Sequence, residues 1–185
     1  KTVFTDTKAL SVLAPSKLSQ AVRSLGSGGL CVYDPSRTVQ RYLQGRGIGF
    51  QSLSNMAQLP ANARVLVLGP DVLDAQTSAA SRLAAWASAG RRVVVLEQKE
   101  PLRYQGLPVP IDTTDHEGRT AYIEDASHPL CAGLQSGDFW TWGVNVPVYK
   151  SAYAKPSQGA RSLIQCHIRL ADSALLEVPA GTGVL

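Results

Sequence analysis

The stretch "ARVLVLGPDVLDAQTSAASRLAAWASAGRRVVVLEQKEP" (residues 63–101) carries the strongest structural signal in the chain. Its two ends are apolar runs, "ARVLVLGPD" (63–71) and "RRVVVLEQ" (91–98). Between them, apolar residues recur at helical spacing: Val72, Ala75, Ala79, Leu83 and Ala87. Two strands that are apolar on both faces and are joined by a helix are typical of a parallel pair covered by helices. The stretch therefore predicts a βαβ unit with a right-handed crossover.

A second unit of the same kind precedes it. The apolar run "LCVYD" (30–34) ends in a helix-start signal, and "RTVQRYLQGRG" (37–47) reads as an amphipathic helix closed by glycines. The segment "IGFQSL" (48–53) can supply another strand. Together the two units predict an α/β fold: a doubly wound, mainly parallel, flavodoxin-like sheet with helices on both faces.

The C-terminal half has a different pattern. Beyond residue 100 the sequence is Pro-rich and alternating, and two β runs are expected at 161–168 and 174–179. They predict an antiparallel extension of the same sheet or a small flap on it. We assign residues 1–27 to an N-terminal helical segment or linker and 28–185 to the α/β domain. The last residues, "GTGVL", read as a strand that is cut off, so we expect the domain to be truncated there.

Composition limits the partners and the redox chemistry. The net charge of +4 comes from scattered residues, and no basic run of the kind that binds nucleic acid or lipid is present. No apolar run approaches the roughly 20 residues that cross a bilayer, so we expect no nucleic-acid and no membrane partner. Three cysteines argue against a disulfide framework, although one bridge plus one free thiol stays open.

Cofactor and metal motifs are not found. The glycine-rich "GRGIG" (45–49) precedes a strand, whereas a phosphate-binding loop follows a strand and opens a helix. His116, His128 and His167 form no spaced metal motif with each other or with the cysteines. Cys166 and His167 are adjacent, so on a strand they point to opposite faces and cannot share a metal. The sequence predicts no cofactor and no metal site.

In an open parallel sheet, ligands bind beyond the carboxyl ends of the strands. The corner after 91–96 carries Glu97 and Gln98 where a nucleophile would stand, with no cysteine or serine. Glu97 is either a base without an identified partner or an acceptor for nearby backbone N–H groups. A hydrolase that uses Glu97, His128 and Asp138 is the catalytic alternative.

The aromatic segment "SGDFWTWG" (136–143) is the best candidate for binding. Its Trp140 and Trp142 would share one face if the segment were a strand, and they either cover the sheet edge or stack on a sugar ring. The candidate binding residues are Glu97, Gln98, His128, Asp138, Trp140 and Trp142.

Several segments resemble a known family. Residues 30–73 and 83–101 resemble the class I glutamine amidotransferase-like fold, in the degenerate version appended to bacterial family 2, β-galactosidase-like glycoside hydrolases. "ASHPLCAGLQSGDFWTWG" (126–143) and "ALLEVPAGTGVL" (174–185) resemble segments of those appended domains. An active amidotransferase has G-x-C-x-G at its elbow, but this chain has "LEQKE" (96–100). Active amidotransferases also have a catalytic His-Pro-Glu sequence. This chain matches it only at His128-Pro129, because the next residue is Leu130.

The resemblance therefore implies an accessory domain without catalysis, because no thiolate is available. Its role would be structural, interdomain or in oligomerisation, with possible glycan contact. The implied partners are neighbouring domains of the same polypeptide or further copies of the chain, and carbohydrate. The implied parent is a glycoside hydrolase, secreted or periplasmic. A stand-alone sugar-binding module is the remaining alternative.

Overall fold

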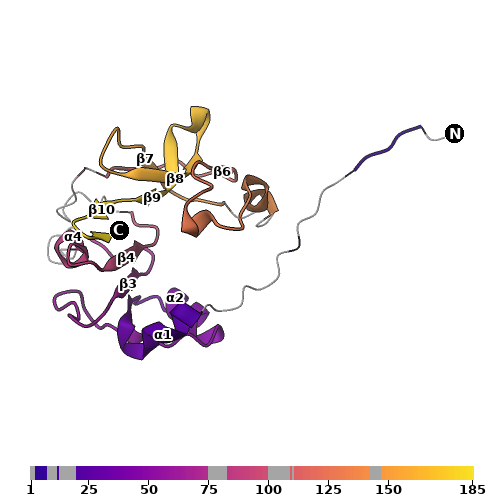
Figure 1. Cartoon of the computed structure of the whole chain (residues 1–185). Helices are drawn as coiled ribbons and strands as arrows, with labels where there is room; N and C mark the ends of the chain where they lie inside the picture. The colour runs from indigo at the N-terminus through magenta and orange to yellow at the C-terminus, as the bar shows by residue number, and fades with distance from the viewer. Residues whose placement is uncertain are drawn as a thin grey trace.

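A computed structural model of the chain describes residues 3–7, 12, 20–74, 83–99, 109, 111–141 and 147–185. Most of the regular structure in these ranges is β-sheet. Two sheets lie one above the other, as Figure 1 shows. The first is built largely from residues before 96 and the second from residues after 112.

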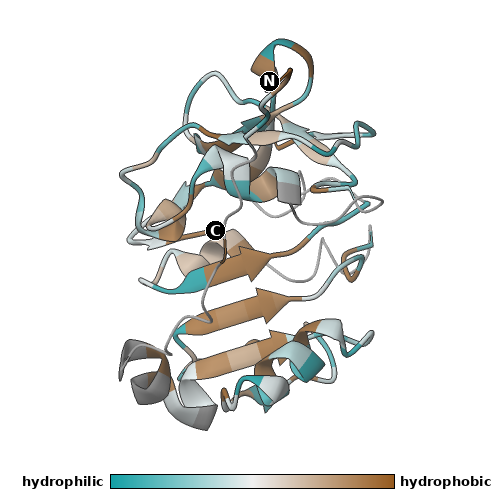
Figure 2. Cartoon of the chain, turned by 90° about the vertical axis from the view of Figure 1, so that its right-hand side faces the viewer, coloured by the Kyte–Doolittle hydropathy of each residue, from teal (hydrophilic) through white to brown (hydrophobic). Residues whose placement is uncertain are grey.

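The first sheet is mixed and has the strand order β10-β11-β4-β3-β1-β2. Its centre is parallel: β1 (Leu30–Tyr33), β3 (Val65–Leu68) and β4 (Arg92–Val95) run side by side in register. Figure 2 shows these strands as the most hydrophobic part of the chain. The parallel pairing predicted for the two apolar runs of residues 63–101 is thus confirmed. At one edge β2 (Gln51–Ser52) pairs in parallel with β1.

The other edge of this sheet is made by residues from far along the chain. β11 (Gly183–Val184) pairs in parallel with β4, and β10 (Pro179–Ala180) pairs with β11 as an antiparallel hairpin. Gly183 fits here because a Cβ at that position would overlap the carbonyl oxygens of Ala87 and Arg91.

The α-helices of the described ranges are short: α1 (Gln20–Gly29), α2 (Thr38–Gly45) and α4 (Leu83–Ala87). α2 lies inside the predicted helix of 37–47. α4 lies inside the predicted helix of 72–90, of which residues 75–82 are outside the described part. α1 crosses the boundary expected between residues 27 and 28, and the division into 1–27 and 28–185 stays a prediction.

The second sheet is entirely antiparallel, with the order β5-β7-β9-β8-β6. Its strands are β5 (Thr113–Thr114), β6 (Ala121–Ile123), β7 (Ala152–Ala154), β8 (Arg161–Cys166) and β9 (Asp172–Glu177). The 3₁₀ helices η2 (Pro129–Cys131) and η3 (Ser136–Thr141) lie between β6 and β7 in the chain, and η4 (Ile168–Leu170) joins β8 to β9.

The predicted doubly wound, flavodoxin-like fold is therefore wrong. The described chain is mostly sheet, its second sheet is separate and antiparallel, and its helices are too few and short for a doubly wound architecture. The physical reason lies in the connections. A parallel sheet needs a crossover of a dozen or more residues between neighbouring strands, whereas β8 and β9 are joined by residues 167–171 and must pair as a hairpin.

Alternation along β1 shows how the first sheet is buried on both faces. Leu30 and Val32 pack with Val39 of α2 in one cluster, while Cys31 packs into the larger core on the opposite face. That larger core contains Leu66, Leu83 and Val93 and also receives Tyr153 and Leu176 from the second sheet. The two sheets therefore share one apolar core.

Candidate functional site

The carboxyl edge of the parallel strands is tightly packed. Asp34 follows β1, Gly69 follows β3, and Gln98 follows β4 by three residues. Asp34 and Gln98 are each only 1% exposed. A Cβ on Gly69 would lie 2.5 Å from Asp34 Oδ1, so only glycine permits this approach.

Gln98 uses its whole side-chain amide inside the protein. Its Oε1 accepts hydrogen bonds from the backbone N–H groups of Val72 and Leu73, both at 2.9 Å. Its Nε2 donates to the carbonyls of Gly69 (2.8 Å) and Leu96 (2.7 Å). The amide thereby ties the ends of β3 and β4 to the segment that follows Asp71. It has no free atom for a substrate.

Glu97 contributes to this corner through its backbone carbonyl. The acceptor role for backbone N–H groups belongs to Gln98, and the carbonyl of Glu97 accepts from the N–H of Asp71 at 2.9 Å. The half-buried Glu97 side chain lies near Tyr153. Burial, with the nearby Glu97 charge as a smaller cause, raises the pKa of Tyr153 above its ordinary value.

Asp34 caps α2. Its Oδ2 accepts from the N–H groups of Val39 (2.7 Å) and Gln40 (3.2 Å), and its Oδ1 accepts from Ser36 Oγ (2.6 Å). An Asp-Pro-Ser sequence ahead of a helix is suited to this arrangement, because the carboxylate satisfies donors that the first turn leaves unpaired. Asp34 thus serves the helix start, where its negative charge also matches the helix dipole.

An open polar cleft of about 550 Å³ lies at this edge. The polar residues that line it include Arg37, Arg41, Gln44, Ser52 and Ser54. It is the place where an open parallel sheet ordinarily binds ligands. Asp34 also lines the cleft, and its carboxylate is hydrogen-bonded to the first turn of α2.

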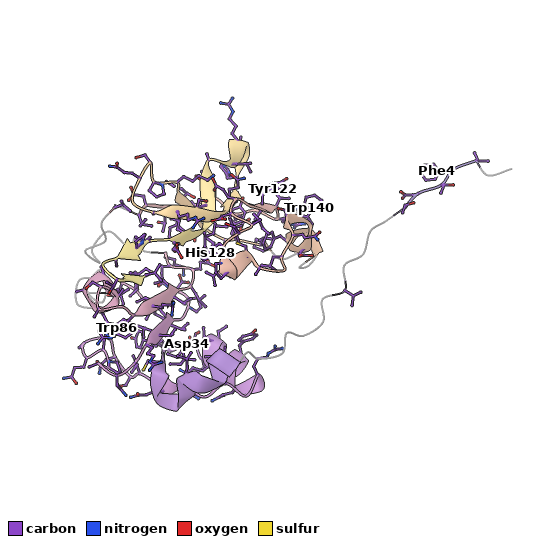
Figure 3. The ribbon with its side chains drawn as sticks, in the orientation of Figure 1. Phe4, Asp34, Trp86, Tyr122, His128 and Trp140 are labelled. Atoms are coloured by element: carbon purple, nitrogen blue, oxygen red, sulfur yellow. The ribbon has the colours of Figure 1, made fainter. Side chains whose placement is uncertain are left out.

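His128, which Figure 3 labels, is held by both ring nitrogens. Its Nδ1 accepts from the N–H of Leu130 at 3.2 Å, so the ring proton is on Nε2, which donates to Glu177 Oε2 at 2.8 Å. The pair fastens η2 to β9. Asp138 acts similarly at η3, where its buried Oδ2 accepts from the N–H of Gln135 at 2.8 Å. The hydrogen bonds described for His128 and Asp138 thus serve η2, β9 and η3.

Trp140 is the exposed member of the aromatic segment. It lies on η3 and not on a strand, with 60% of its surface exposed, while Phe139 beside it is buried. Its ring meets the exposed ring of Tyr122 edge-on, with centroids 6.4 Å apart at 76° (Figure 3). Trp142 lies outside the described residues.

The three cysteines are free and buried, which settles the open alternative against a disulfide. Burial raises the pKa of each thiol, to about 11 for Cys166. The thiols therefore stay protonated near neutral pH and do not supply a nucleophile.

One cluster was missed by sequence reasoning. His116, His167 and Asp172 meet at the end of the second sheet, although His116 and Asp172 are 56 positions apart. No spacing motif marks them, because the contact depends on strand pairing in a sheet that the sequence did not predict.

Comparisons with known proteins give little more. No protein-family model matches the chain, and no curated protein matches it. Among solved structures, it is similar to a β-galactosidase from Bifidobacterium adolescentis at 14% identity, with a TM-score of 0.34, over 86% of this chain and 89% of that chain. Within the described residues, no helix has the length and apolar character of a membrane span.

Proposed function

We propose that this chain is a non-catalytic accessory domain of a larger carbohydrate-active protein, where it packs against neighbouring domains or another copy of itself. The observation that carries the proposal is Gln98. At the corner where an α/β enzyme would present its nucleophile, this chain has an amide that is buried and closed by four hydrogen bonds.

The other acid–base candidates support the same conclusion. His128 has neither ring nitrogen available, and Asp138 holds the N–H of Gln135. A general base needs an atom within hydrogen-bond reach of a substrate proton. Side chains whose polar atoms are hydrogen-bonded within the protein stabilise the fold instead. The carbohydrate context rests on the resemblance of residues 126–143 and 174–185 to the appended domains of β-galactosidase-like enzymes.

The test is turnover by the natural full-length protein that carries this chain. Glu97→Gln and His128→Gln are expected to leave kcat and KM for a glycoside substrate within about twofold of wild type, because neither group touches substrate. Glu124→Gln, at a partly exposed carboxylate paired with Lys155, is the matched control. If Glu97→Gln or His128→Gln lowers kcat by about a hundredfold or more, in the range of lost acid–base catalysis, while the melting temperature is unchanged, the hydrolase alternative replaces the proposal.

Trp140 favours glycan contact as a second role. A large exposed indole beside Tyr122 offers a flat face of the kind that stacks on sugar rings. Titration with β-linked galacto- and gluco-oligosaccharides is expected to change the Trp fluorescence of the wild-type chain but not that of Trp140→Phe. Trp86→Phe is the matched control, since Trp86 is buried and bonded to the carbonyl of Pro60. A flat wild-type response removes the glycan role and leaves the structural one.

A further inference from the structure

Three ligand-type side chains converge where the strands of the second sheet end. His116 comes two residues after β5, His167 directly follows β8, and Asp172 begins β9. One nitrogen or oxygen from each lies within 4.8 Å of the others. Two imidazoles and one carboxylate are a ligand set used for divalent transition metals.

Asp172 is the fixed member of this cluster. Its side chain is only 7% exposed, and its backbone is paired with Cys166 on one side and Ala154 on the other. Its Oδ2 lies 2.7 Å from His116 Nδ1 and 3.4 Å from Thr114 Oγ1. Within the described ranges, no lysine or arginine forms an ion pair with it. A buried carboxylate is costly unless it is paired or binds a metal, and the side-chain partners described for Asp172 are the His116 imidazole and the Thr114 hydroxyl.

The backbone holds His167 over the cluster in a strained conformation. Its φ of 67° and ψ of −176° are rare for a residue with a side chain, and Arg169 and Leu170 also have positive φ. The N–H of His167 donates to the Tyr149 hydroxyl at 3.2 Å. Gly118 makes room for that hydroxyl, because a Cβ there would overlap it. The result is a stack of the His116 and His167 rings with centroids 3.7 Å apart and planes 9° apart.

We propose that His116, His167 and Asp172 bind a divalent transition metal ion, with zinc as the representative member. Imidazole and carboxylate together suit zinc and its neighbours better than magnesium or calcium. Three protein ligands leave a coordination position for water or for a ligand from a partner. Cys166 is not among the side chains whose ligand atoms converge here, although it directly precedes His167.

Binding requires a small local rearrangement. Zinc holds nitrogen and oxygen ligands at about 2.0–2.2 Å, so tetrahedral neighbours are about 3.4 Å apart. The 2.7 Å hydrogen bond between His116 and Asp172 therefore opens, and the ion takes the place of its proton. The neutral His116 ring then carries its proton on Nε2. Because ring lone pairs lie in the ring plane, parallel rings cannot point at one ion, and the His116 ring turns out of the stack. Its side chain is 46% exposed and free to do so.

The experiment is zinc titration of the complete, tag-free chain by calorimetry after treatment with a chelator. We expect one zinc ion per chain, weaker binding of magnesium, and an affinity about tenfold or more lower in His116→Gln. His128→Gln is the matched control and should bind like wild type. The chain has no fourth histidine. In thermal unfolding, added zinc should raise the melting temperature of wild type and of His128→Gln, but not that of His116→Gln.

His116 is exposed, and the amide of a glutamine can still donate to the Asp172 carboxylate, so His116→Gln should leave the fold intact; the melting curve without zinc checks this. NMR supplies a second readout, because zinc should shift the His116 and His167 ring signals together as the stack opens. The proposal is overturned by no zinc binding, by equal zinc affinity in wild type and His116→Gln, or by zinc shifts confined to His128.

Discussion

Replacing Gln98 by leucine is expected to lower the free energy of unfolding by about 3–5 kcal/mol, because buried polar groups without partners cost about 1–3 kcal/mol each and their costs are only partly additive. Leucine has a similar volume, but it lacks the Oε1 that accepts two hydrogen bonds and the Nε2 that donates two. It leaves the N–H groups of Val72 and Leu73 and the carbonyls of Gly69 and Leu96 unsatisfied. Urea unfolding followed by circular dichroism measures the effect.

The matched control is Gln58→Leu, at an exposed position, where a change within about 0.5 kcal/mol is expected. Gln98→Glu adds a finer comparison, since a carboxylate still accepts from Val72 and Leu73 but faces two carbonyls without a proton to donate. It should lie between wild type and Gln98→Leu if it is protonated in the fold. If Gln98→Leu unfolds at the same urea concentration as Gln58→Leu, the four hydrogen bonds of Gln98 do not stabilise the fold as proposed.

Asp34→Ala is expected to cost about 2–4 kcal/mol, because the first turn of α2 loses its cap and two N–H groups lose a charged acceptor. The carboxylate accepts hydrogen bonds from the N–H groups of Val39 and Gln40 and from the hydroxyl of Ser36. The two N–H groups belong to the first turn of α2. Loss of the cap should also free the helix start, so hydrogen exchange at the N–H groups of Val39 and Gln40 should accelerate more than at the strand β3.

Ser36→Ala serves as the comparison for Asp34→Ala. It removes the hydroxyl that donates to Asp34 and accepts from the exposed N–H of Thr38 at 3.3 Å, and it should cost less than about 1 kcal/mol. Equal losses in the two variants would contradict the assignment of Asp34 as the acceptor that holds α2.

The parts of this fold that the sequence predicted depend on local patterns. The apolar runs around residues 65–68 and 92–95 are long enough to be buried on both faces, so their parallel pairing followed from residue type alone. The start of α2 could be predicted for the same reason. Asp34-Pro35-Ser36 is a turn sequence that contains a carboxylate able to accept from the N–H groups of the helix start.

The rest depended on contacts between distant segments. The wrong architecture came from extending the parallel pattern past residue 100, where short connections force antiparallel pairing. His116 and Asp172 come together only through the pairing of β5, β7 and β9. For Gln98 the sequence placed the residue at the right corner, but three of its four backbone partners lie at residues 69–73, more than 20 positions earlier in the chain.

The position of β11 beside β4 has a consequence for how the chain folds during synthesis. When β1, β3 and β4 have emerged from the ribosome, the outer edge of β4 has no neighbour until β11 is made, after every strand of the second sheet. A bare hydrophobic edge recruits other chains, and pairings between distant segments form slowly. The chain should therefore be prone to aggregate during synthesis, after β4 has formed and before β11 pairs with it. Chaperones should be needed most during that period.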